Sequence, residues 1–374
     1  MGKDKCIRRS SAKNAKPDKR KLAYGRKTIL ELENAMTNIL IIYTGGTIGM
    51  VKDYATGVLR PFNFDKLQKK IPELKQLDCQ IDAVSFESPI DSSNMNPGYW
   101  VRIAELIEQH YEGHDGFVVL HGSDTMSYTA SALSFMLENL TKPVIFTGSQ
   151  LPIGDLRTDA KENLITSIQI AALQEKGRPV VREVGLYFEY KLYRANRTTK
   201  INAENFEAFA SLNHPPLIES GVHLNVYWEN LYRRKGRGKF KVHRNMDTNM
   251  AVLKLFPGMD VKVLGAVLDI PELRGLVLET YGAGNAPTEA WLSDSLRDAI
   301  SRGIHIVNVT QCSGGSVDMG HYETSEQLKK AGLIEGKDLT TEAAVAKLMY
   351  LLGSGIPHKS FKSVYETSLR GEMD

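Results

Sequence analysis

Two threonines and a lysine are the side chains in this sequence whose types and settings suggest chemistry. Thr47 and Thr125 each end a short stretch rich in glycine and hydroxyl side chains. A threonine hydroxyl becomes an effective nucleophile only when a base removes its proton. Lys200 is the candidate base, and Asp124 would orient it, as a third group orients the base in other triads. This set favours acyl transfer, with backbone N–H groups of the glycine turns stabilising the oxyanion.

The glycines before Thr47 allow a second interpretation, because glycine-rich turns at helix N-termini also bind phosphate. No Gly-Lys-Ser/Thr sequence follows them, so the stretch is not a P-loop. Gly282-Ala283-Gly284 lacks the third glycine of a dinucleotide fingerprint, and Pro287 interrupts it. The spacings of Cys6, Cys79 and Cys312 match neither a disulfide framework nor a zinc site. We therefore predict no structural metal and a reducing compartment.

Both threonines should lie at one edge of a parallel sheet. The apolar runs 39–43 and 116–120 are typical of buried parallel strands, and each leads directly into a threonine stretch. The carboxyl ends of parallel strands share an edge, where open α/β sheets bind their ligands. The polar stretch Asp91–Pro97 has two interpretations, a helix N-cap with a turn or the wall of a polar pocket. By itself it favours the N-cap.

Strands and helices alternate along the chain, which predicts an α/β fold with parallel sheets. At 374 residues, two domains are expected, a larger N-terminal one at 38–226 and a smaller C-terminal one at 250–374, joined by a linker at 227–249. The expected strands lie at 39–43, 80–87, 116–120, 144–147, 184–188, 275–279 and 304–309. The expected helices lie at 64–77, 98–111, 126–140, 158–174, from about 288, and at 325–332, 340–353 and 359–370.

The net charge of +3 is unevenly distributed. Residues 1–37 hold eleven Lys and Arg but four Asp and Glu, a net charge of +7, which leaves about −4 for the other 337 residues. This basic leader lacks the apolar core of a secretory signal, and its composition favours a disordered tail over a nucleic-acid-binding arm or a targeting peptide. No apolar run approaches the roughly 20 residues needed to span a bilayer, so we expect no membrane partner.

The two threonine stretches, Tyr43–Met50 and His121–Met126, resemble the two threonine motifs of the L-asparaginase family, most closely those of its cytoplasmic type I bacterial members. Several further matches occur in the family's order, at Asp91–Ser93, Tyr128–Asn139, Gly148–Gln150, Asn196–Lys200, Tyr281–Pro287 and Thr310–Cys312. The resemblance covers roughly residues 38–374 and leaves only the basic leader outside. Separate motifs in the same order make a chance match improbable.

The resemblance implies a mechanism. The family's first threonine, which matches Thr47, attacks the side-chain amide carbon of L-asparagine and gives a β-aspartyl enzyme and ammonia. The second threonine forms a triad with aspartate and lysine, which match Thr125, Asp124 and Lys200. No cofactor is implied.

The resemblance also implies a substrate pocket shared between subunits of a homotetramer, a dimer of dimers. Asp124 would bind the substrate α-amino group, helped by the turn Asp91, Ser92 and Ser93. Asn285 would reach the pocket from a second copy of the chain. Thr199 and Cys312 match a regulatory asparagine site that some type I enzymes have.

One position departs from the family pattern. Many members carry a catalytic tyrosine after a glycine in the loop that follows the first motif, but here Gly57 precedes Val58. Tyr54 and Tyr322 are the two alternatives, and the sequence does not choose between them.

The sequence also allows three other functions. A related amidotransferase subunit, which releases ammonia for glutaminyl-tRNA synthesis, has an added N-terminal domain, and the 37-residue leader is too short to be that domain. A non-catalytic asparagine-binding sensor would not need two threonines and a lysine base. Nucleic-acid binding would rest on residues 1–37 alone. An asparaginase is therefore the leading hypothesis.

Overall fold

The strand that leads to Thr47 lies inside an eight-stranded sheet. The computed structural model describes residues 36–52, 59–61, 71–234, 236, 238–320 and 323–374. The strand order is β15 (Leu224–Val226), β14 (Ile218–Ser220), β11 (Lys191–Arg194), β10 (Val184–Phe188), β7 (Val144–Thr147), β5 (Gly116–Leu120), β1 (Thr37–Gly45) and β4 (Cys79–Ile90). β1 pairs in parallel with β4 on one side and with β5 on the other.

Five of these strands, from β10 to β4, run parallel, and β11, β14 and β15 extend the sheet in antiparallel fashion. The expectation of a parallel sheet is therefore confirmed for the part that carries the threonines and is wrong for the other end. The cause is a two-residue turn, Glu189 and Tyr190, which joins β10 to β11 and reverses the chain. A two-residue connection can link only antiparallel neighbours.

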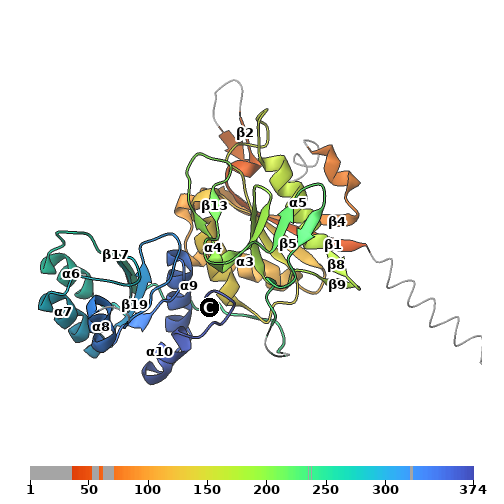
Figure 1. The fold of residues 1–374 in the computed structure, drawn as a ribbon. Helices are drawn as coiled ribbons and strands as arrows, with labels where there is room; N and C mark the ends of the chain where they lie inside the picture. Colours follow the sequence, from red (N-terminus) through yellow and green to blue (C-terminus); the bar gives the residue numbers. More distant parts are fainter. Residues whose placement is uncertain (1–35, 53–58, 62–70, 235, 237, 321–322) are drawn as a thin grey trace, which may run out of the picture. The chain divides into compact units, whose positions relative to one another are not determined.

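Side chains of β1 alternate between two buried layers, as strand geometry requires. Leu40 and Ile42 pack into one apolar cluster with α3 (Pro97–His110) and α4 (Met126–Met136). Ile39 and Ile41 pack into a second cluster with α5 (Ala160–Ala172). Figure 1 shows these helices around β1 and β5. Burial on both faces explains why residues 39–43 of β1 form an unbroken apolar run.

A second, four-stranded parallel sheet follows in the order β17 (Met250–Lys254), β18 (Gly275–Thr280), β19 (His305–Thr310) and β20 (Ile334–Glu335). Its helices are α6 (Val261–Leu268), α7 (Ala290–Ser301), α8 (Glu323–Ala331), α9 (Thr341–Gly353) and α10 (His358–Tyr365). α6, α7 and α8 share one apolar cluster with this sheet, while α9 shares the cluster that contains α4. The α/β fold with a larger N-terminal and a smaller C-terminal domain is confirmed.

The described residues also form several short elements. The 3-10 helices are η1 (Thr47–Gly49), η2 (Pro72–Gln76), η3 (Ser92–Asn94), η4 (Ser123–Thr125) and η5 (Ala195–Arg197). The small two-stranded pairs are β2 (Met50–Lys52) with β3 (Leu59–Pro61), β6 (Leu137–Glu138) with β16 (Lys241–Val242), β8 (Gln174–Glu175) with β9 (Arg178–Pro179), and β12 (Thr199–Lys200) with β13 (Phe209–Ala210).

Several expected boundaries are wrong. The helix expected at 126–140 ends at Met136, because the next residues form β6 and pair with β16. The helix expected at 359–370 ends at Tyr365, and Glu372 accepts hydrogen bonds from the backbone of Leu369 and Arg370 beyond it. The helix expected at 64–77 falls mostly outside the described residues, and its described part is the 3-10 helix η2. β17 and α6 were not expected.

Residues 37–374 form one compact unit. The boundaries proposed at 226 and 250 remain predictions. No helix in the described ranges is long and apolar enough to cross a membrane.

Candidate active site

The carboxyl ends of β1, β4 and β5 bring three polar turns together. Gly45 pairs with Ile90 at the end of β4, and a Cβ atom at Gly45 would lie 2.0 Å from the Ile90 carbonyl oxygen. Gly46 has a φ of 84°, and a Cβ there would lie 2.4 Å from the backbone nitrogen of Gly122. Only glycine allows this close approach of backbones. The two glycines therefore place the Thr47 turn against the turns that follow β4 and β5.

Thr47 begins η1 and is half-buried. The loop after it is held by the buried Tyr43, whose hydroxyl donates to the Gly49 carbonyl over 3.1 Å. Burial raises the pKa of Tyr43 to about 12, so this hydroxyl stays protonated and keeps donating. Thr44 adds a hydrogen bond of 2.9 Å to the Leu120 carbonyl of β5. The hydroxyl of Thr47 is thus carried by a backbone anchored on both sides.

Thr125 lies at the end of η4, and its Oγ1 donates to the Ser92 carbonyl over 2.8 Å. Ser92 is buried and begins η3, whose N-cap is Asp91. The Asp91 carboxylate accepts from the Ser93 backbone over 2.8 Å. The turn is therefore a cap, as its composition favours, and it also contacts the second threonine directly.

Lys200 and Asp124 form an ion pair, with 2.6 Å between Nζ and Oδ1. The Lys200 side chain is 16% exposed, whereas that of Asp124 is 63% exposed and open to a ligand. Nζ also donates to the Ser123 hydroxyl over 2.9 Å. The structure thus joins Lys200 from β12 to Asp124 and Ser123 of η4.

Ser123 and Gln150 also belong to this network, although the sequence predicted no role for either. Ser123 accepts from Lys200 and donates to the Gln150 side chain over 3.3 Å. The Gln150 amide donates to the carbonyls of Ala203 and Asn205, in the loop after Lys200. Ser123 lies inside a threonine stretch, and this position could have indicated that it belongs to the site. The role of Gln150 depends on contacts more than 50 residues away in sequence, which no local pattern indicates.

His121, the first residue after β5, is buried, and burial lowers its pKa to about 4. Its Nδ1 lies 2.7 Å from the Gly122 carbonyl oxygen. At neutral pH the imidazole is therefore uncharged and adds no positive charge to the turn that it supports.

The remaining predicted residues lie elsewhere. Asn285 lies in a turn after β18, where its backbone exchanges hydrogen bonds with Tyr281. The Thr199 hydroxyl donates to Glu342 of α9 over 2.7 Å. Cys312 is an exposed free thiol after β19. Tyr54 and Tyr322 both lie outside the described residues. Within the described ranges, no group of three or more His, Cys, Asp and Glu side chains is arranged to hold a metal ion.

Two family descriptions match the chain in succession. The family "Asparaginase, N-terminal" matches residues 38–232, and the "Glutaminase/Asparaginase C-terminal domain" matches residues 249–364. Together they span the eight-stranded sheet, all the turns described above and most of the C-terminal domain.

Individual relatives agree with this match. The chain is 42% identical to L-asparaginase 1 of Escherichia coli strain K12, over 90% of this chain and 98% of the relative. It is 32% identical to a glutamyl-tRNA(Gln) amidotransferase subunit of Pyrococcus furiosus, over 93% of this chain and 79% of that protein.

A solved structure is also similar. The crystal structure of L-asparaginase I from Vibrio cholerae superposes with a TM-score of 0.82 at 40% sequence identity, covering 91% of this chain and all of that one. With the threonine turns, the Lys200–Asp124 pair and these matches together, the chain belongs to the asparaginase family.

Proposed function

We propose that this chain hydrolyses L-asparagine to L-aspartate and ammonia, with Thr47 as the nucleophile. The observation that carries the proposal is the convergence of three turns, in which Gly46 lies against Gly122 and Thr125 bonds to Ser92. Lys200 joins the same turns through Asp124. The identity to L-asparaginase 1 of Escherichia coli supports the choice of substrate.

In the proposed reaction, the Thr47 oxygen forms a bond to the side-chain carbonyl carbon of asparagine, and the carbon–nitrogen bond breaks. Ammonia leaves with the proton of the hydroxyl, and a β-aspartyl ester on Thr47 remains. Water then attacks this ester, which releases aspartate and restores the hydroxyl. Backbone N–H groups of the turns would stabilise the oxyanion in both steps.

Thr125, Asp124 and Lys200 would move the protons. An amine accepts a proton only in its neutral form, so Lys200 must act as the free amine at that step. Without substrate, Lys200 bonds to Asp124 and Ser123, while Thr125 bonds to Ser92. Rotation of the Thr125 hydroxyl toward Lys200 on substrate binding would close the triad, since catalytic hydrogen bonds often tighten only in the complex.

The exposed Asp124 carboxylate would bind the substrate α-amino group, next to the Asp91, Ser92 and Ser93 turn. We further propose that the working form is a homotetramer, a dimer of dimers, in which Asn285 of a second copy completes the pocket. A cytoplasmic location is supported by the free thiols of Cys79 and Cys312. Either Tyr54 or Tyr322 remains the proposed supporting tyrosine.

Thr47→Ala and Thr125→Ala test the proposal directly. Each should lower ammonia release from L-asparagine at least ~1,000-fold, because each removes a group that the reaction needs. Thr367→Ala, at an exposed threonine, is the control and should keep full activity. Full activity in either of the first two variants would overturn the assignment.

The same assay discriminates the remaining alternatives. Ammonia from L-glutamine but not from L-asparagine would favour the amidotransferase subunit, and binding of asparagine without ammonia would favour a sensor. A sigmoidal dependence of rate on asparagine, lost in Cys312→Ala, would support a regulatory site at Thr199 and Cys312. A hyperbolic curve for the unmodified chain would count against that site.

A further inference from the structure

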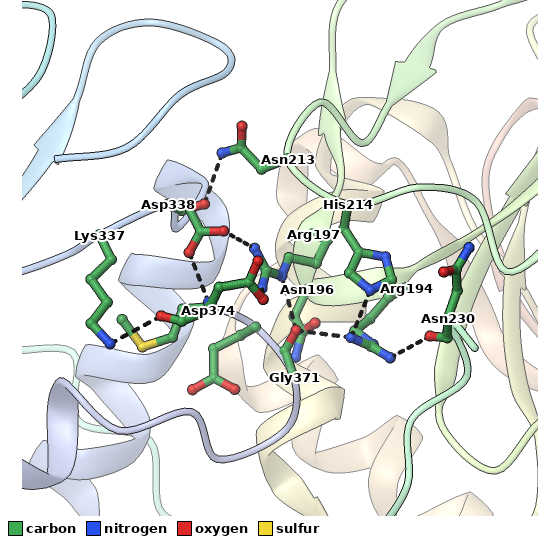
Figure 2. Close-up of polar contacts among 12 residues, drawn as sticks. Arg194, Asn196, Arg197, Asn213, His214, Asn230, Lys337, Asp338, Gly371 and Asp374 are labelled. Carbon is green, nitrogen blue, oxygen red and sulfur yellow. Dashed lines mark hydrogen bonds and ion pairs between the residues drawn. The ribbon is translucent and has the colours of Figure 1, made fainter.

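Arg197 is a charged side chain that is almost completely buried, three residues before Lys200. Its side chain is 1% exposed. Nη1 donates to the Asp338 carboxylate, Nη2 donates to Oδ1 of Asp374 over 2.8 Å, and Nε donates to the Gly371 carbonyl over 2.9 Å (Figure 2). All three acceptors belong to the C-terminal part of the chain. The guanidinium fork therefore joins η5 to residues 338–374 at three points.

The neighbours of Arg197 bind the same C-terminal residues. Arg194 donates to the Gly371 carbonyl over 3.2 Å, and Asn196 donates to the Arg370 carbonyl over 3.3 Å. Gly371 has a φ of 77°, and a Cβ there would lie 2.7 Å from Nη1 of Arg194. Figure 2 shows the Arg194 side chain directed at the Gly371 carbonyl. The contact is a close, specific fit and not a loose surface pairing.

The acceptors are themselves held in place. The backbone N–H of Asp374 donates to Oδ1 of Asp338 over 3.0 Å, and Lys337 donates to the Asp374 carbonyl over 3.0 Å. Glu372 forms a fully buried ion pair with Lys347 of α9, with 2.5 Å between the two charged atoms. The acceptors of Arg197 are therefore tied to neighbouring residues by hydrogen bonds of their own.

From Arg197 the chain runs directly to the base. Thr198 bonds to the Ala195 carbonyl, and the Thr199 hydroxyl bonds to Glu342. Lys200 follows at once and reaches Asp124. Three residues span at most ~10 Å, so no loop lies between Arg197 and Lys200 to absorb a displacement.

We propose that Arg197 is a positioning residue for Lys200: by binding Asp338, Gly371 and Asp374 together, it holds the 195–200 segment so that the Lys200 amine lies against Asp124. The proposal rests on the proposed function, in which Lys200 is the base. It gives Asp338, Gly371 and Asp374 a part in catalysis, which they exert through Arg197.

Arg197→Lys is the test variant, because it keeps the positive charge but lacks the fork that reaches three acceptors. We expect kcat for ammonia release from L-asparagine to fall at least ~10-fold, with KM changed less than ~3-fold, since substrate contacts are retained. A fall of kcat below twofold would overturn the proposal.

Arg274→Lys is the matched control. It makes the same exchange at Arg274, whose ion pair with Asp247 lies outside both the 195–200 segment and residues 338–374. We expect its kcat to stay within ~3-fold of the unmodified chain at a temperature where both variants are folded. An equal loss of kcat in Arg274→Lys and Arg197→Lys would show general loosening and would also overturn the proposal.

A readout without turnover separates this proposal from the proposed function. Lys200 should be acetylated by acetic anhydride several-fold faster in Arg197→Lys, measured by mass spectrometry against the exposed Lys262 in the same sample. This comparison holds even when the unmodified chain releases no ammonia, an outcome that would overturn the proposed function alone. An unchanged rate at Lys200 contradicts the positioning role. If Arg197→Lys does not fold, Asp338→Asn replaces it, because this substitution keeps the shape of the side chain but removes its charge. Lys200 should again be acetylated faster than in the unmodified chain, and an unchanged rate would again contradict the positioning role.

Discussion

At the scale of single residues, Gly46 decides how closely the two threonine turns approach. Its backbone lies where any side chain would meet the backbone of Gly122, and backbone atoms cannot move aside as a flexible side chain can. The distance between Thr47 and the Thr125 turn therefore depends on a residue that has no side chain.

Gly46→Ala should lower kcat/KM for asparagine at least ~100-fold, because a misplacement of about 1 Å at a reacting group has effects of that size. Gly177→Ala is a matched control. Gly177 also has a positive φ, 70°, but a Cβ there meets nothing within 4 Å. The control should show only a small loss of stability and normal kinetics. Normal kinetics in Gly46→Ala would contradict the packing argument.

At the scale of elements, the β10–β11 turn contains Tyr190 at a position where the backbone conformation favours glycine. Glu189 and Tyr190 have φ values of 41° and 69°, the left-handed region that two-residue hairpins of this type require. The β8–β9 turn has the same geometry, with φ values of 52° and 70°, but carries Lys176 and Gly177. Glycine enters this region without the steric cost that Tyr190 incurs.

Tyr190→Gly should therefore raise the free energy of unfolding by about 1 kcal/mol, less the extra chain entropy that glycine loses on folding. Urea unfolding measures the change. Tyr190→Ala, which removes the ring but keeps the Cβ atom, separates the backbone effect from loss of the exposed side chain and should not stabilise. Equal effects of the two substitutions would refute the conformational explanation.

At the scale of the whole molecule, stability should depend on pH through three histidines in different regions. The pKa values of His121, His214 and His305 are each lowered to about 4, and burial is the largest cause. In the unfolded chain a histidine titrates near 6.5. Between these values the unfolded state binds protons that the folded state does not, so stability present above pH 6.5 is lost as pH falls toward 4.

Glu189 acts in the opposite direction. Burial and the nearby carboxylates raise its pKa to about 7, so the folded state binds this proton first as pH falls. Because three histidines outweigh one glutamate, we expect the free energy of unfolding to fall between pH 6.5 and 4.5. Each histidine whose effect Glu189 does not offset contributes up to ~1.4 kcal/mol per pH unit. Urea unfolding at several pH values checks the slope.

His305→Phe should reduce that slope by about one proton. The His305 ring stacks on Phe361 with 3.7 Å between ring centres, so phenylalanine keeps the stacking and removes only the titration. An unaltered slope in this variant would show that His305 is not one of the groups responsible.

The sequence alone determined the features that depend on local patterns. Buried strands such as 39–43 read as unbroken apolar runs, and the threonine stretches follow them, so the fold class and the residues at the sheet edge were predictable. The Asp91 turn and the helix after it were readable from their capping residues for the same reason.

Only the tertiary structure decided the features that depend on distant residues. The bonds of Gln150 to the loop after Lys200 and of Arg197 to Asp338 join positions 53 and 141 residues apart. The end of α4 at Met136 was likewise set by a distant pairing partner, because the residues that follow it pair with β16. Local propensity carries no information about such partners, because the free energy of these contacts arises only when the whole unit is packed.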